Sequence, residues 1–136
     1  MSTENKAIVQ KVYDVINSKE LDGLDALIAV DVNDHDPGPG TAPGLAGTKQ
    51  TLGMFHAVFS NFQVTAQDMI ADDNKVVARL TVNGTNTGEF MGLPPTGKQI
   101  TMAGIEMFRV ADGKIVERWA EFDMMSLMQQ LGAMES

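Results

Sequence analysis

The spacing of apolar residues changes once along this chain, from a helical period to strand alternation, and that change constrains the fold most. Ile8, Val12 and Ile16 recur at helical spacing, which predicts an amphipathic helix. Three helices are expected before the change, at residues 4–18, around 24–28 and at about 48–60. From Phe62 onward the pattern is that of β-strands rich in Val, Leu and Thr.

A meander of long strands is expected after residue 62. These strands cover about residues 64–69, 75–83 with a continuation at 85–89, 99–110 and 114–122. Gly84 marks a possible bulge, and residues 111–113 form a tight hairpin turn. The stretches 33–40 and 92–97 are so rich in Pro and Gly that they must be loops. A short helix that ends at Gly132 closes the chain.

Helices first and strands afterwards define the α+β class. With 136 residues, no repeat and no shift in composition, we expect a single domain over residues 1–136. A curved antiparallel sheet with N-terminal helices on one side would make a cone-shaped barrel, and its interior is the natural ligand site. Periodicity alone indicates the α+β class but not the cone.

The composition excludes several kinds of chemistry. The chain has no cysteine, so thiolate catalysis, disulfides and iron–sulfur clusters are excluded. Its two histidines, His35 and His56, have no metal-ligand spacing, and no glycine-rich nucleotide motif occurs. A net charge of −8 argues against nucleic acid and anionic membranes as partners.

The segment 1–10 lacks the apolar core of a signal peptide, and no apolar stretch is long enough to cross a bilayer. We therefore expect a cytoplasmic protein. Because the two histidines lack a metal-ligand spacing, we also expect no metal. What remains is acid–base chemistry by carboxylates or imidazoles in an apolar pocket. The ten methionines fit either a core or a deformable pocket wall.

Four ordered blocks carry a family resemblance. They are residues 33–37 (NDHDP), 88–98 (GEFMGLPPTGK), 108–119 (FRVADGKIVERW), and 122–123 followed by 127–132 (FD and LMQQLG). In this order they resemble the SnoaL-like polyketide (ester) cyclases. The resemblance runs over nearly the whole chain, and its two C-terminal blocks are the most specific.

The resemblance implies the cone-shaped fold shared with nuclear transport factor two and scytalone dehydratase. It also implies an intramolecular aldol condensation that closes the last ring of an aromatic polyketide, without metal or organic cofactor. The ligand would be small and apolar or aromatic, and the protein would be a homodimer or homotetramer.

Asp123 is the catalytic residue that the resemblance implies. Desolvation in an apolar cone would raise the pKa of its carboxyl, so that one group could act first as base and then as acid. The structural alternative is an N-cap of the helix that begins at Met124, because Asp is a favoured cap. The same oxygen geometry cannot serve both roles.

The other candidates each have a structural alternative. His35 could polarise a substrate carbonyl as a second catalytic group, or it could be an ordinary loop histidine. His56 lies on the helical face of Phe55 and Phe59, as a pocket residue or a core histidine. Trp119 lies four residues before Asp123, so on a regular strand both would share a face; it could stack on a ligand or pack in the core. The remaining candidates for ligand contact are Phe55, Phe59, Phe90, Met91, Glu106, Met107 and Arg79.

Two rival functions stay open. A non-catalytic binding domain could use the same cone, since fold alone does not decide function. The other rival is an epoxide hydrolase or a cofactor-free hydroxylase. Epoxide hydrolysis usually needs several carboxylates and an arginine around one water, which requires Glu106 and Arg79 to point inward.

Overall fold

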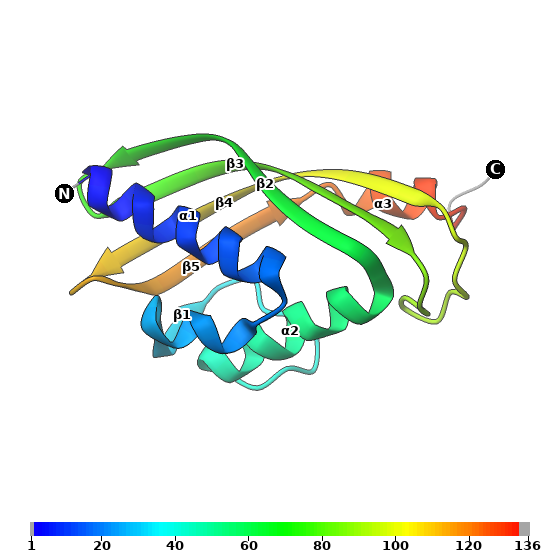
Figure 1. Cartoon of the computed structure of the whole chain (residues 1–136), viewed down its shortest axis with the longest axis horizontal. Coiled ribbons are helices and arrows are strands. Elements are labelled where there is room, and N and C mark those ends of the chain that lie inside the picture. The colour runs from blue at the N-terminus through cyan, green and yellow to red at the C-terminus, as the bar shows by residue number, and fades with distance from the viewer. Residues whose placement is uncertain (1, 134–136) are drawn as a thin grey trace.

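A five-stranded curved sheet, with helices packed on one face, forms the body of the protein (Figure 1). The computed structural model describes residues 2–133. Its elements, in chain order, are α1 (Ser2–Ser18), the 3₁₀ helix η1 (Leu21–Ala26), β1 (Ile28–Asp34), α2 (Gly44–Val58), β2 (Phe59–Asp72), β3 (Lys75–Asn86), β4 (Gln99–Ala111), β5 (Lys114–Phe122) and α3 (Met124–Gln130). The strand order is β1-β5-β4-β3-β2, and only the β1–β5 pair is parallel.

Strands β3 and β4 lie inside the sheet, and their side chains alternate strictly between buried and more exposed positions. Every second residue of β3 is buried, from Val76 to Asn86, and the same holds for β4 from Ile100 to Val110. The two strands pair without interruption from Lys75↔Arg109 to Thr85↔Gln99. Because directly opposed residues share a face, this register fixes which side chains reach the concave side of the sheet.

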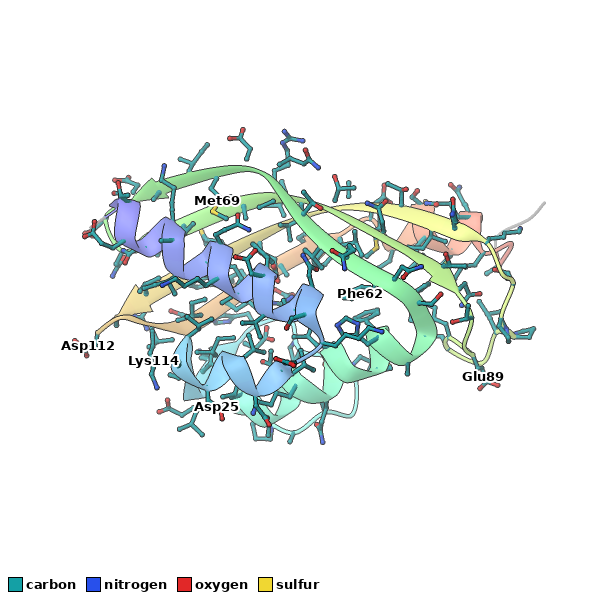
Figure 2. All side chains as sticks on the ribbon, viewed as in Figure 1. Asp25, Phe62, Met69, Glu89, Asp112 and Lys114 are labelled. Carbon is teal, nitrogen blue, oxygen red and sulfur yellow. The ribbon has the colours of Figure 1, made fainter. Side chains whose placement is uncertain are left out.

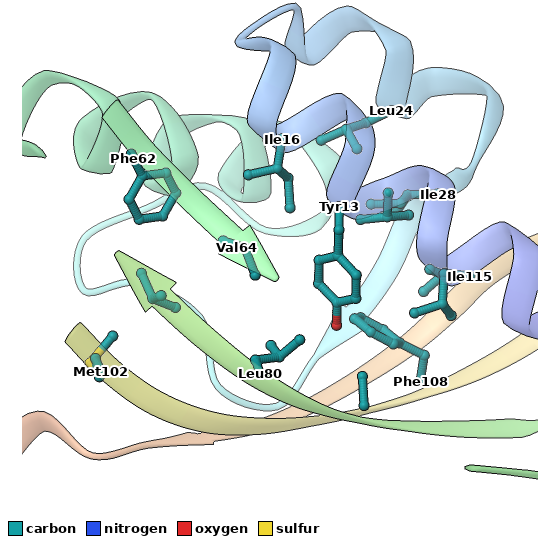
Figure 3. Packing of buried hydrophobic residues seen from close by; sticks show 14 of the residues in the cluster. Tyr13, Ile16, Leu24, Ile28, Phe62, Val64, Leu80, Met102, Phe108 and Ile115 are labelled. Atoms are coloured by element: carbon teal, nitrogen blue, oxygen red, sulfur yellow. The ribbon is translucent and has the colours of Figure 1, made fainter. Parts of the chain in front are cut away.

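Helix α1 lies across the concave face and supplies one wall of the core. Its buried residues Val9, Val12, Tyr13 and Ile16 follow the helical period. Figure 3 shows the Tyr13 ring extending from α1 with its hydroxyl oxygen directed toward the sheet, next to Phe108. The helix therefore brings a hydroxyl group into a largely apolar interior.

Two connections between strands lie at opposite ends of the molecule. The β4–β5 hairpin turns at Asp112 and Gly113, which both have positive φ (52° and 78°), and the loop that contains Glu89 lies at the opposite end (Figure 2). Beside the hairpin, Lys114 Nζ donates to the carbonyl of Asp25, 3.1 Å away. No helix among residues 2–133 is long and apolar enough to span a membrane.

The α+β class and the curved sheet with N-terminal helices are confirmed. The helix expected around 24–28 is wrong, because a 3₁₀ helix ends at Ala26 and Ile28 already begins strand β1. Helix α2 begins at Gly44 rather than 48, and β2 begins at Phe59.

The irregularity expected at Gly84 lies instead on the partner strand. The β2–β3 register shifts between Ser60 and Gln63, opposite Gly84, while Gly84 itself pairs regularly with Ile100. A Cβ at Gly84 would lie 2.8 Å from the Cβ of Phe59. The glycine therefore allows β2 to cross β3 closely at the bulge.

Candidate active site

An apolar cavity of about 110 Å³ lies between the concave face of the sheet and the helices. Residues from α1, α2, α3 and strands β2 to β5 line it, and most of them are aliphatic or aromatic. Its lining consists of Tyr13, Ile16, Thr51, Leu52, Phe55, Phe59, Phe62, Val64, Val82, Ile100, Met102, Glu106, Arg118, Phe122, Met124 and Leu127. Such a space favours a small ligand with an apolar or aromatic surface.

Stacked phenylalanines form the wall of the cavity near α2. The Phe55 ring lies 5.6 Å from Phe62 and 6.3 Å from Phe59, centroid to centroid, and both pairs are nearly parallel. Phe90, from the loop after β3, packs behind them at 5.7 Å from Phe59. These rings pack against one another and give this part of the cavity an aromatic wall.

One carboxylate, Glu106 of β4, lies in this apolar lining. Its side chain is 9% exposed. The Tyr13 hydroxyl donates to Oε1 at 2.7 Å, and Arg118 Nε donates to Oε2 at 2.7 Å. A buried carboxylate is stable only when it is paired and hydrogen-bonded, and these two donors meet that requirement.

Arg118 links Glu106 to a second carboxylate at the end of β1. Its Nη1 donates to both carboxylate oxygens of Asp34, at 2.9 and 3.0 Å, and to the carbonyl of Asp36 at 3.2 Å. The Asp36 carboxylate in turn accepts from the amide of Ala120 at 2.7 Å. The result is a carboxylate–guanidinium–carboxylate array with Tyr13 at one end.

The electrostatics of this array keep both donors protonated. Burial raises the pKa of the Tyr13 hydroxyl far above its ordinary value, and the negative charge of Glu106 adds to the rise. Burial lowers the pKa of Arg118, but Glu106 and Asp34 outweigh this effect and hold it above the usual value. Tyr13 is therefore a hydrogen-bond donor, and Arg118 is a permanent cation.

Three of the predicted site residues line the cavity: Phe55, Phe59 and Glu106. Phe55 lies on helix α2, Phe59 is the first residue of β2, and Glu106 follows the alternation of β4. Phe90 is buried behind the cavity wall, whereas Met91 is 69% exposed on the loop.

Asp123 follows the last strand and has the geometry of a helix cap. Its Oδ1 accepts from the amide of Ser126 at 3.0 Å, and the residue is exposed. Its neighbours Phe122 and Met124 line the cavity, so Asp123 lies beside the cavity without being part of the lining. The catalytic role of Asp123 stays a prediction of the resemblance.

Trp119 and His35 lie together on the outer side of the sheet. Trp119 pairs directly with Met107, one position away from the inward pair Glu106↔Ala120. The His35 ring stacks on Trp119 at 4.8 Å and bonds to Glu117 through Nε2 at 2.7 Å. Trp119 faces away from the cavity, and the strand ends at Phe122, so the regular strand on which Trp119 and Asp123 were expected to share a face does not reach Asp123.

Arg79, Met107 and His56 also lie outside the lining. Arg79 pairs with Ile105 on the outer face and is exposed, so it does not point inward as the hydrolase alternative required. His56 donates from Nε2 to the carbonyl of Ile16 at 2.7 Å and meets the Phe62 ring edge-on. Its buried Nδ1 has no partner within residues 2–133.

Sequence reasoning missed Tyr13, Arg118 and Asp34. Tyr13 is the chain's one tyrosine and lies on the apolar face of α1, which is a usable signal. Arg118 becomes visible only once the β4–β5 register places it opposite Phe108. Among the described residues no group of three or more metal-ligating side chains gathers; the expected absence of metal and cofactor stays a prediction.

The fold and the cavity together define a small α+β protein that encloses an apolar space with one buried carboxylate. Among solved structures, IdmH from Streptomyces antibioticus, provisionally described as a polyketide cyclase, is 35% identical over 94% of this chain and 98% of its own, with a TM-score of 0.83. AclR from Streptomyces galilaeus, provisionally described as a hydroxylase, is 26% identical over 100% of this chain and 89% of its own, with a TM-score of 0.88.

TsrD from Streptomyces laurentii is 23% identical over 98% of both chains, with a TM-score of 0.90, a likeness of fold alone. No curated protein matches this chain. The family model of the SnoaL-like polyketide cyclases matches residues 6–131. The chain therefore belongs to the SnoaL-like polyketide cyclase family.

Proposed function

We propose that this protein is a cofactor-free acid–base enzyme of the polyketide cyclase type. It would act on a flat, apolar ketone or ester and close a ring by intramolecular aldol addition. The observation that carries the proposal is the buried carboxylate of Glu106 in the wall of an apolar cavity. Family membership and the similarity to IdmH support the substrate class.

The proposed base is Glu106. It takes a proton from the carbon between an ester and a ketone carbonyl, and the electron pair of the broken C–H bond forms an enolate. The enolate carbon then attacks the second carbonyl, a carbon–carbon bond forms, and the carbonyl oxygen receives the proton back from Glu106. Atoms and charge balance without any further reactant.

Tyr13 and Arg118 would prepare this step. Both bonds to Glu106 measure 2.7 Å, and they hold its oxygens in one orientation inside the cavity. The guanidinium bonds use Nε and Nη1, so Nη2 takes part in none of them. A cation beside the developing enolate oxygen would stabilise its negative charge.

The test compares two carboxylates. The probe is methyl 3-oxo-3-(2-naphthyl)propanoate in deuterium oxide, and proton NMR follows exchange of its activated methylene protons above the buffer rate. We expect Glu106→Gln to lower this exchange about 10²-fold or more, as for loss of a general base. Asp123→Asn should keep the rate, since Asn replaces Asp well as a helix cap.

The opposite result would assign the role of general base to Asp123 instead of Glu106. Loss of exchange in Asp123→Asn alone would make Asp123 the base, as the resemblance implies. No exchange above buffer in the wild type, together with tight binding of the probe, would favour the non-catalytic binding domain. Circular dichroism of each variant controls for folding.

A second candidate, epoxide hydrolysis, is favoured by the array Glu106–Arg118–Asp34. When two carboxylates bind one guanidinium, one of them can accept a proton from the attacking water and the other, in its protonated form, can protonate the epoxide oxygen. Styrene oxide added to the same enzyme tests it. Diol formation that Glu106→Gln abolishes, without methylene exchange on the ester probe, would favour the hydrolase.

A further inference from the structure

A second cavity, of about 290 Å³, lies between the end of β1 and the start of α2. Small and polar residues dominate its lining, including Asn33, Asp34, Gly38, Thr41, Thr48 and Thr51. No lysine or arginine lines it, and its carboxylate, Asp34, is already paired with Arg118. Such a lining favours neutral hydrogen-bonding groups, such as hydroxyls and esters, over charged ones.

This polar cavity adjoins the apolar cavity at Thr51. Thr51 belongs to the lining of both. Arg118 lines the apolar cavity and Asp34 lines the polar one, so their ion pair at 2.9 Å also joins the two spaces. The loop approaches this boundary closely, since a Cβ on Gly38 would lie 2.4 Å from Thr51 Oγ1.

Size supports a joint use of the two spaces. Ligand pockets commonly measure about 300–1000 Å³. The apolar cavity, at about 110 Å³, and the polar one, at about 290 Å³, each fall below this range. A ligand that extends through both would occupy a space of ordinary size.

We propose that the two cavities form one bipartite site for an amphipathic ligand, divided at Thr51. The apolar cavity takes a flat aromatic ring system, and the polar cavity takes a hydroxyl- or ester-bearing side chain. This inference rests on the proposed function for the ring-binding half, and it adds the polar half and the kind of side chain that half selects.

The test measures the binding of two probes by calorimetry. One is 1,4-naphthoquinone, which offers rings alone, and the other is 2-(2,3-dihydroxypropyl)-1,4-naphthoquinone. We expect the dihydroxypropyl probe to bind the wild type about tenfold more tightly, as for two hydrogen bonds of ordinary net strength. Thr48→Leu fills the polar cavity, and leucine is a better helix former than threonine, so α2 should fold normally.

In Thr48→Leu the tenfold preference should vanish while naphthoquinone binding stays at its wild-type value. Thr48→Val, of nearly the same volume as the wild type, should keep most of the preference. Equal binding of both probes to the wild type, or an equal loss of both in Thr48→Leu with an unchanged melting temperature, would overturn the bipartite site and leave the proposed function standing. Failure of both probes to bind the wild type would contradict the proposed function as well.

Discussion

At the scale of single residues, Tyr13 and Arg118 stabilise the buried carboxylate of Glu106 in the cavity. An ionised carboxylate in an apolar interior costs several kcal/mol unless charge and hydrogen bonds compensate it. Arg118 supplies the charge and Tyr13 the second bond to Glu106, both at 2.7 Å. Glu106 is therefore paired through both carboxylate oxygens and held in one orientation inside the cavity.

Tyr13 gives a direct measurement of this arrangement. Its pKa is raised by burial and by Glu106, and it is the one tyrosine of the chain, so tyrosinate absorbance near 295 nm reports on it alone. In the native protein we expect no ionisation at pH 10, whereas in concentrated guanidinium chloride Tyr13 should titrate near its ordinary value of about 10.

The same shift predicts how stability depends on pH. Because the folded-state pKa lies above the unfolded one, the contribution of Tyr13 is fully present below about pH 10 and is lost as the pH rises toward the folded value. Urea unfolding at several alkaline pH values should show this decline. A tyrosinate signal near pH 10 with unchanged circular dichroism would contradict the burial of the hydroxyl.

At the scale of elements, helix α3 is short and depends on its cap. It has seven residues, and its buried Leu127 closes one side of the apolar cavity. Asp123 satisfies the amide of Ser126 at 3.0 Å. We expect Asp123→Ala to lower the free energy of unfolding by about 1 kcal/mol, while Asp123→Asn changes it little.

Urea unfolding of the two Asp123 variants checks this prediction, with the wild type as reference. Equal stabilities of Asp123→Ala and the wild type would show that the cap contributes nothing. Asn keeps an oxygen acceptor but not the charge, so this pair separates capping from any role of the carboxylate in the cavity.

The strands show what the sequence could predict and what it could not. The Val-, Leu- and Thr-rich stretches and the turn at Asp112 and Gly113 are local signals. They predicted the start of β3, both ends of β4 to within a residue and the hairpin, but the expected continuation to residue 89 extends past the end of β3 at Asn86. Strand β1 has no such signal, because it exists through parallel pairing with β5, more than eighty residues away (Ile28↔Ile115).

The residues of the candidate site also fall into those that the sequence could predict and those that it could not. Phe55 was predictable from the face of a helix, whereas Phe59 lines the cavity from the first position of β2. The Tyr13–Glu106–Arg118 cluster joins α1, β4 and β5, so it needs the sheet register and the position of α1. Two of its members carried local signals: Tyr13 lies on the apolar face of α1, and Glu106 shares the inward parity of Met102 and Phe108.

At the scale of the whole molecule, the outer face of the sheet carries an apolar row. Ile70, Val77, Met107 and Trp119 are paired across β2, β3, β4 and β5 and therefore share this face. Ile70 is 67% exposed, and Ile105 in the next row is 52% exposed. A continuous row of this kind is a feature of association surfaces.

We propose that a second copy of the chain covers this face. The row beside the apolar one holds Asp68, Arg79, Ile105 and Glu121 in sequence across the strands. A face that carries both charge signs around an apolar centre can complement itself about a two-fold axis, with Arg79 of one copy opposite an acidic residue of the other.

Light scattering after size-exclusion chromatography tests this association. We expect a mass of twice the 14.7 kDa chain, and Ile105→Glu should shift it to that of a single chain, because a buried unpaired charge at the centre of an interface is costly. Val30→Glu is the matched control, since Val30 is 80% exposed on the edge strand β1. A wild type that runs as a single chain would refute the dimer. An Ile105→Glu variant that keeps the double mass would show that the copies associate through another surface, and the outer row would then face solvent in the functional protein.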